Sequence, residues 1–188
     1  MPLPDNERAR MSSPHDLVYR EVGECLHAWS QVEVDLSALF AALHGVPMQE
    51  ASHPIRQVFE VVQSFETRVA MTNRSVECFI DAHPAYAEAW QPLKNKIERS
   101  ARRRHEVAHF VLISRNAIHG IKPFFTFHNF RTKQGRGELT ARQIADRARG
   151  FFDLSTRVRR HAGYVSRLQG LPVESDLATA DLAHLLER

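Results

Sequence analysis

One arginine and two histidines lie within six residues in the stretch RRRHEVAHF, which runs from Arg102 to Phe110. Histidine takes and returns a proton near neutral pH, and arginine holds a phosphate group and offsets charge in a transition state. Arg104 and His109, with four residues between them, therefore combine the side chains suited to cleaving RNA through its own 2′-hydroxyl. That chemistry needs no metal ion, and the sequence indicates no cofactor.

The same stretch also matches a second pattern, because residues 105–109 read H-E-x-x-H, the signature of zinc proteases. On a helix His105 and His109 point about 40° apart, so both could bind one zinc ion while Glu106 acts as general base. A metzincin continues with a glycine and a histidine, but this chain has Leu112 and Arg115 there. A zinc-dependent hydrolase is therefore the weaker alternative.

The charges of the chain are distributed unevenly. Residues 99–167 contain 16 Lys and Arg against 4 Asp and Glu, a net charge of +12, whereas the rest of the chain carries 9 against 18, a net charge of −9. A half this basic attracts a ligand rich in phosphate, although it also suits an acidic protein surface. We expect Arg99, Arg102 and Arg103 to bind an RNA strand or a nucleotide.

Apolar residues recur at three- and four-residue steps in four segments, which predicts four long amphipathic helices. The expected helices run from Asp16 to His44, from Pro54 to just before His83, from Pro84 to a break by Gly120, and from Thr140 to Gly170. Ser52 is a candidate cap for the second helix, and Thr140 with Gln143 forms a capping box for the fourth. Arg104 falls on the apolar stripe of the third helix, where an arginine needs a partner, a cleft or access to water.

Residues 121–139 are rich in aromatic side chains and contain Gly135 and Gly137, which mark a turn. They predict a short β-hairpin or an ordered aromatic loop, and the aromatic segment Phe124 to Phe130 either packs over the bundle or stacks bases. The expected fold is all-α, a four-helix up-and-down bundle with this hairpin or loop inserted before the last long helix. Residues 1–14 would be a flexible N-terminus, 15–170 the bundle, and 171–188 a weakly helical tail.

Several classes of protein are disfavoured by composition. The sequence has no apolar run long enough to cross a bilayer and no apolar core for a secretory signal near its start, so we expect a cytoplasmic protein without membrane partners. Cys25 and Cys78 stand alone, without a CxxC pair or a Cys/His cluster. They predict neither a disulfide framework nor a structural zinc site.

The arrangement resembles the HEPN (higher eukaryotes and prokaryotes nucleotide-binding) superfamily over roughly residues 15 to 168. Its mark, Arg-x4-6-His near the end of the third helix, reads here Arg104-His105-Glu106-Val107-Ala108-His109, preceded by LKNKIERSARR. The first helix also looks like these proteins, with Ala28-Trp29-Ser30-Gln31-Val32-Glu33-x-x-Leu36 followed by Leu39-Phe40. One departure is His105, where asparagine or aspartate is more usual.

The resemblance implies a metal-independent endoribonuclease that forms homodimers with a composite site. It also implies a role as the toxin of a toxin-antitoxin or phage-defence system, often beside a nucleotidyltransferase-type antitoxin. In this interpretation Arg104 anchors phosphate, His109 is general acid or base, and His105 orients the substrate. The alternative is a non-catalytic helical module that binds nucleotides or proteins, because some family members do so, and because cations near a helix C-terminus also compensate the helix dipole.

Overall fold

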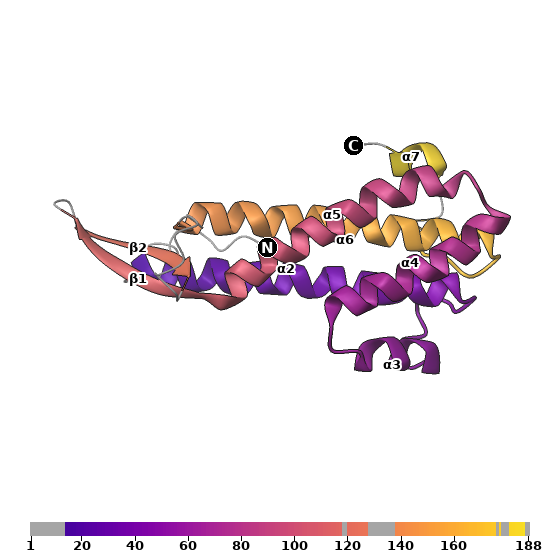
Figure 1. Ribbon diagram of the computed structural model, residues 1–188, viewed down its shortest axis with the longest axis horizontal. Coiled ribbons are helices and arrows are strands. Elements are labelled where there is room, and N and C mark those ends of the chain that lie inside the picture. The colour runs from indigo at the N-terminus through magenta and orange to yellow at the C-terminus, as the bar shows by residue number, and fades with distance from the viewer. Residues whose placement is uncertain (1–13, 118–119, 128–137, 176, 178–180, 187–188) are drawn as a thin grey trace. The chain divides into compact units, whose positions relative to one another are not determined.

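The computed structural model describes residues 14–117, 120–127, 138–175, 177 and 181–186. Its helices are α2 (Pro14–Leu43), α3 (Pro54–Val61), α4 (Phe65–Ala82), α5 (Tyr86–His109), α6 (Ala141–Leu168) and α7 (Leu182–Leu186). Strands β1 (Phe110–Ala117) and β2 (Gly120–Phe127) form an antiparallel hairpin between α5 and α6 (Figure 1). The fold is thus an all-α bundle with a short hairpin before the last long helix, which confirms the fold class predicted from the sequence.

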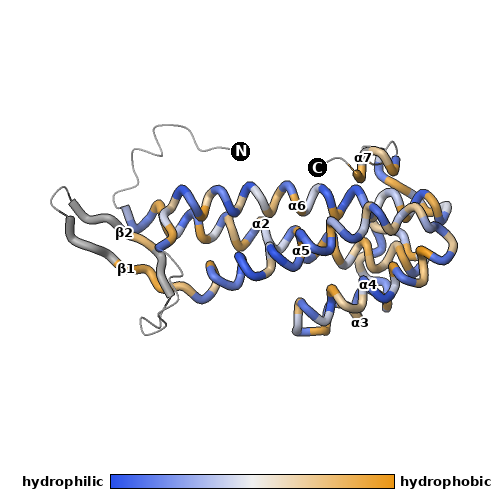
Figure 2. Tube along the Cα trace, turned by 45° about the horizontal axis from the view of Figure 1, so that its top comes forward, coloured by the Kyte–Doolittle hydropathy of each residue, from blue (hydrophilic) through white to orange (hydrophobic). Residues whose placement is uncertain are grey.

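The long helices alternate hydrophilic and hydrophobic residues along their length, as amphipathic helices do (Figure 2). The capping box at the start of α6 is confirmed, because the Gln143 backbone N–H donates to Thr140 Oγ1 at 3.3 Å and the Thr140 N–H donates to Gln143 Oε1 at 2.9 Å. Gly45 and Gly170, just after α2 and α6, have φ values of 76° and 69°. This left-handed conformation favours glycine and ends both helices where the sequence predicts.

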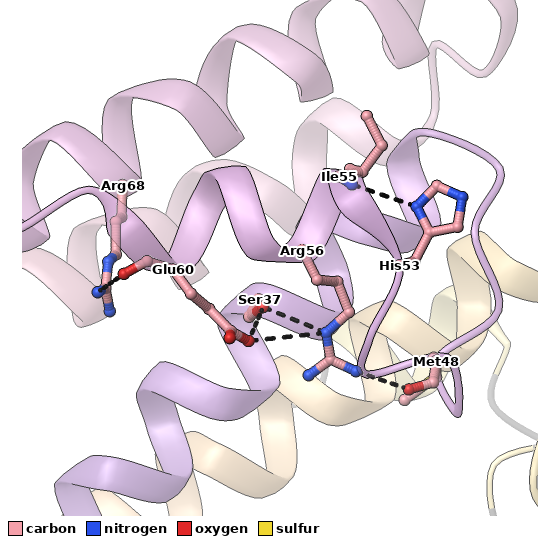
Figure 3. A network of polar contacts seen from close by, with 7 residues as sticks. All are labelled: Ser37, Met48, His53, Ile55, Arg56, Glu60 and Arg68. Carbon is pink, nitrogen blue, oxygen red and sulfur yellow. Dashed lines mark hydrogen bonds and ion pairs between the residues drawn. The ribbon is translucent and has the colours of Figure 1, made fainter.

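The sequence predicts one second helix, whereas the structure has two, α3 and α4. Val62 ends α3 in an extended conformation, and Ser64 caps α4 by accepting a hydrogen bond from the Thr67 N–H at 3.2 Å. Arg68 donates to the carbonyl oxygen of Glu60 at 2.8 Å (Figure 3) and to that of Val62 at 2.8 Å, and so satisfies carbonyls at the end of α3. The predicted cap at Ser52 is also wrong, because the residue in that position is His53.

The end of the third helix also differs from the prediction. The sequence predicts a helix that continues past His109, but α5 ends at that residue and β1 begins at Phe110. The run FVLIS favours a strand because it is rich in β-branched and aromatic residues. The hairpin therefore starts earlier than expected, and its register pairs Ala117 with Gly120. The turn predicted at Gly135 and Gly137 lies outside the described residues, as do residues 128–130 of the aromatic segment and most of the expected N-terminal tail.

The chain divides into two compact units, and α2, α5 and α6 each contribute a part to both. The first unit comprises residues 1–29 and 102–151. Its core includes Trp29 and Phe151, whose rings meet edge to face with centroids 5.2 Å apart. Val107 and Phe110, 2% and 8% exposed, anchor the junction between α5 and β1 in that core.

The second unit comprises residues 30–101 and 152–188. Its core contains Phe59, which stacks on Phe40 with centroids 4.5 Å apart, and Tyr86, which stacks on Tyr164 at 5.7 Å. The Tyr86 hydroxyl and Nδ1 of His161 are 2.9 Å apart and share a buried hydrogen bond. None of the helices described for the chain combines the length and the apolar character that crossing a membrane requires.

Candidate functional site

The last two turns of α5 carry the residues that the sequence singles out, and all of them from Arg102 to His109 belong to the first unit. Val107 faces the core, so this turn of the helix cannot rotate freely. The helix ends at His109, which places that histidine at the C-terminus of α5, one residue before the buried Phe110. The candidate site is therefore the C-terminal end of a helix held by the apolar residues on either side of His109.

Arg104 is half-buried, and its Nε atom is inaccessible to solvent with no hydrogen-bond partner among the described residues. This agrees with its position on the apolar stripe predicted from the sequence. A buried guanidinium nitrogen without an acceptor is costly, by about 1–3 kcal/mol for a typical polar group and more for a charged one. Such an atom retains the capacity to donate to an anionic ligand.

His105 and His109 are both exposed, and their rings lie on the same side of α5 with centroids 4.2 Å apart and planes inclined by 49°. The structure therefore brings together two of the three residues predicted to be catalytic. No hydrogen bond or ion pair within the described part of the chain joins Arg104 to either ring. Arg104 is half-buried with its Nε atom covered, whereas the two imidazoles are exposed to solvent.

The predicted RNA-binding arginines are not equivalent. Arg102 and Arg103 are exposed, directly before Arg104 in the first unit. Arg99 belongs to the second unit, where its Nε donates to the Asn95 carbonyl oxygen at 3.2 Å. Arg99 is exposed as well, so all three side chains are accessible to solvent, and RNA binding by each of them stays a prediction.

Arg147, on α6, is a part of this site that the sequence reasoning missed. Its Nη2 lies 2.7 Å from Glu106 Oε2, and its Nη1 donates to the Arg103 carbonyl oxygen at 2.9 Å. The Arg147 guanidinium therefore holds the turn of α5 that carries Arg104 in place and also pairs with the Glu106 carboxylate. The helical periodicity of α6 gives a weak signal that Arg147 contacts another helix. Arg147 directly precedes the buried Ala148 and so lies at the edge of the inward face of α6.

The buried thiol of Cys25 belongs to the same unit. Burial raises its pKa to about 11, and the positive charge of Arg147 acts in the opposite direction. Because the thiol stays protonated at neutral pH, Cys25 behaves as a small apolar core residue and not as a nucleophile. This fits the sequence-based expectation of an isolated cysteine.

The zinc interpretation requires a third ligand near His105 and His109. Throughout the described ranges, no group of three or more His, Cys, Asp or Glu side chains is arranged to hold a metal ion. Glu106, the general base in that interpretation, is instead engaged by Arg147.

Comparisons of the chain with models of protein families, with curated proteins and with solved structures gave no match.

Proposed function

We propose that the protein is a metal-independent endoribonuclease of the HEPN type, with Arg104, His105 and His109 at its active site. The observation that carries the proposal is the half-buried Arg104, whose Nε has no acceptor among the described residues, on the same helix end as two exposed imidazoles. When the Arg104 side chain turns outward, an RNA phosphate supplies the acceptor that its Nε lacks. The net charge of +12 over residues 99–167 supports an anionic substrate.

The reaction divides among these side chains by their chemistry. His109 removes the proton of the 2′-hydroxyl or protonates the leaving 5′-oxygen, and Arg104 offsets charge on the phosphate as the phosphorus–oxygen bond forms. His105, in ring contact with His109, orients the substrate. The exposed Arg102 and Arg103 hold the neighbouring phosphates.

A homodimer completes the proposal. In-line cleavage uses a base on one side of the phosphorus and an acid on the other, and one helix end presents a single set of these groups. Two copies related by a two-fold axis supply both sets. Sedimentation equilibrium should show a dimer, and a strictly monomeric active enzyme would contradict this part of the proposal.

The decisive experiment follows cleavage of a fluorescent single-stranded RNA by wild type, His109→Ala and Arg104→Ala, with and without EDTA. We expect wild-type cleavage to survive EDTA and both variants to lose at least about a hundredfold in rate, the order expected for losing a general acid or base. His27→Ala and Arg74→Ala, which alter an exposed histidine and an exposed arginine elsewhere, serve as matched controls and should cleave like wild type.

Three outcomes would contradict the proposal in different ways. Activity abolished by EDTA and restored by zinc would favour the hydrolase that uses His105, Glu106 and His109. RNA binding without cleavage by the folded wild-type protein would favour a non-catalytic binding module. Equal cleavage by all variants would place the activity outside this helix end.

The role as a toxin rests on the same residues. Expression of the wild-type chain should arrest bacterial growth, and Arg104→Ala should relieve the arrest at equal protein level. Co-expression of a nucleotidyltransferase-type antitoxin should also relieve it. Growth arrest that persists in Arg104→Ala would separate toxicity from RNA cleavage.

A further inference from the structure

His105 and His109 form a pair of exposed imidazoles one helical turn apart, next to the point where α5 ends and β1 begins (Figure 1). Residues four positions apart on a helix lie side by side, and these two rings are in contact with centroids 4.2 Å apart. Of the 11 histidines in the sequence, no other two are three or four residues apart. This helix end therefore places two imidazoles within reach of one ion.

The separation of the two rings suits a single transition-metal ion. An imidazole nitrogen lies about 2.0–2.1 Å from a bound zinc ion, so two nitrogens on one tetrahedral ion are about 3.4 Å apart. The rings of His105 and His109 are inclined by 49°, and from their present separation small rotations of the two side chains bring a nitrogen of each to that distance. Both side chains are open to an ion from solvent.

The helical turn beneath the two rings is fixed before any ion binds. Val107, between them in the sequence, is 2% exposed and packs in the core. Arg147 holds the same turn from α6, through the Arg103 carbonyl oxygen and the Glu106 carboxylate. The spacing of the two histidines does not have to be created on binding, which lowers the entropic cost of chelation.

The charges near the pair act in both directions. The C-terminal end of α5, where His109 is the last residue, carries partial negative charge that attracts a cation. Arg102, three residues before His105, opposes this attraction, but it is exposed and can extend its guanidinium into water. Because that charge is solvated, it weakens binding of a cation without preventing it.

We propose that His105 and His109 together bind a zinc ion and that the bound ion inhibits RNA cleavage. Water completes the coordination, because no group of three or more possible ligands is gathered within the described ranges. The ion occupies the nitrogen lone pair with which His109 accepts a proton, so the loaded site cannot act as a base. The inhibition rests on the function proposed above, whereas the binding of zinc does not.

Isothermal titration calorimetry of the untagged full-length protein with zinc chloride tests the binding without RNA. We expect saturable binding by wild type and an affinity at least about tenfold lower in His105→Ala and in His109→Ala, because a single imidazole cannot chelate. His27→Ala, which removes an exposed histidine elsewhere, should bind like wild type. Magnesium chloride should bind far more weakly, since that ion prefers oxygen ligands.

Arg102→Gln tests the electrostatic part of the argument. It removes the cation three residues before His105, so the affinity for zinc should rise about twofold to fivefold, and this gain should shrink as salt is added. Arg142→Gln, which changes an exposed arginine on α6, should leave the affinity unchanged. All of these variants replace exposed side chains, so their melting temperatures should stay near that of wild type.

The cleavage assay tests the inhibition. Zinc should slow RNA cleavage by wild type and EDTA should restore it, which is the reverse of a zinc hydrolase. His105→Ala, which keeps His109, should need at least about tenfold more zinc for half-inhibition. Equal zinc affinity in wild type and both histidine variants would overturn the site. Zinc bound at the pair without slower cleavage would overturn the inhibition, and zinc binding by a protein that cleaves no RNA would support the site and contradict the proposed function.

Discussion

Arg147, on α6, contacts the end of α5 through two bonds, an ion pair with Glu106 at 2.7 Å and a hydrogen bond to the Arg103 carbonyl oxygen at 2.9 Å. The side chains of Arg147 and Glu106 are 17% and 27% exposed, so water screens this pair less than a surface pair. The contact fixes the turn that carries Arg104. It also holds the Glu106 carboxylate against Arg147.

The first prediction concerns Arg147→Met, which keeps the length of the side chain and removes its charge. We expect a loss of about 1–2 kcal/mol in the free energy of unfolding. The substitution removes the partly buried, charge-assisted bond to Glu106 and leaves the Arg103 carbonyl oxygen without its donor. The rate of RNA cleavage should fall about tenfold, because the turn of α5 that positions Arg104 loses its contacts with Arg147. Urea unfolding and a cleavage assay measure the two effects.

Arg142→Met provides the comparison, since Arg142 is exposed on the same helix. It should change the free energy of unfolding by less than about 0.5 kcal/mol. If Arg142→Met and Arg147→Met destabilise the protein equally, the contact with Glu106 contributes nothing specific.

The second prediction separates the two chemistries at this helix end by Glu106→Gln. The amide keeps a hydrogen bond to Arg147 but cannot act as a base, so cleavage should stay within about threefold of wild type and remain insensitive to EDTA. A zinc-dependent hydrolase would instead lose at least about a hundredfold in rate, because its general base would be gone. The cleavage assay with and without chelator distinguishes these results.

The sequence was sufficient to predict the fold class and the start and end of α6, because these depend on local signals. A capping box at Thr140 and a glycine with positive φ at Gly170 act within a few residues. The position of Arg104 on an apolar stripe was predictable for the same reason, since helical phase is local. These features needed no knowledge of distant contacts.

The break between α3 and α4 could not be predicted in the same way. Val58, Val62, Phe65 and Val69 continue the apolar period straight through it, so periodicity indicates one helix. The break depends on Ser64 as a cap and on Arg68, whose side chain reaches back to the carbonyls of α3. The pairing of Arg147 with Glu106 could not be predicted either, because residues 99–167 contain 16 Lys and Arg side chains, many of which could pair with Glu106.

The third prediction concerns pH. Burial lowers the pKa of His161 from its ordinary value of 6.5 to about 3, and the nearby charge of Arg157 acts in the same direction. The unfolded chain therefore binds a proton that the folded protein does not. Stability from this group is complete above about pH 6.5 and is lost as pH falls towards 3, at up to about 1.4 kcal/mol per pH unit.

We expect wild type to lose about 2 kcal/mol between pH 7 and pH 5 from this group, measured by urea unfolding. His161→Gln removes the titrating group, so its loss over the same interval should be smaller by that amount, although its stability at pH 7 falls because the bond with Tyr86 is altered. His44, whose pKa burial also lowers, contributes equally to both proteins and cancels in the comparison. Parallel pH dependences in the two proteins would show that His161 titrates normally.

The fourth prediction compares two glycines in the interior of α6. A Cβ atom at Gly150 would meet nothing within 4 Å, whereas one at Gly163 would lie 2.9 Å from the Cβ of Leu177. Alanine in a helix is favoured over glycine by about 0.5–1 kcal/mol, so Gly150→Ala should raise the free energy of unfolding by that amount.

At Gly163 the contact outweighs this gain, because Leu177 is buried and its Cβ moves only with its backbone. Gly163→Ala should therefore lower stability by about 1–2 kcal/mol. It should also speed hydrogen exchange at the Leu177 amide, which donates to the Glu174 carbonyl oxygen at 2.9 Å. If Gly163→Ala stabilises the protein as Gly150→Ala does, the segment at Leu177 moves aside freely and does not pack against α6.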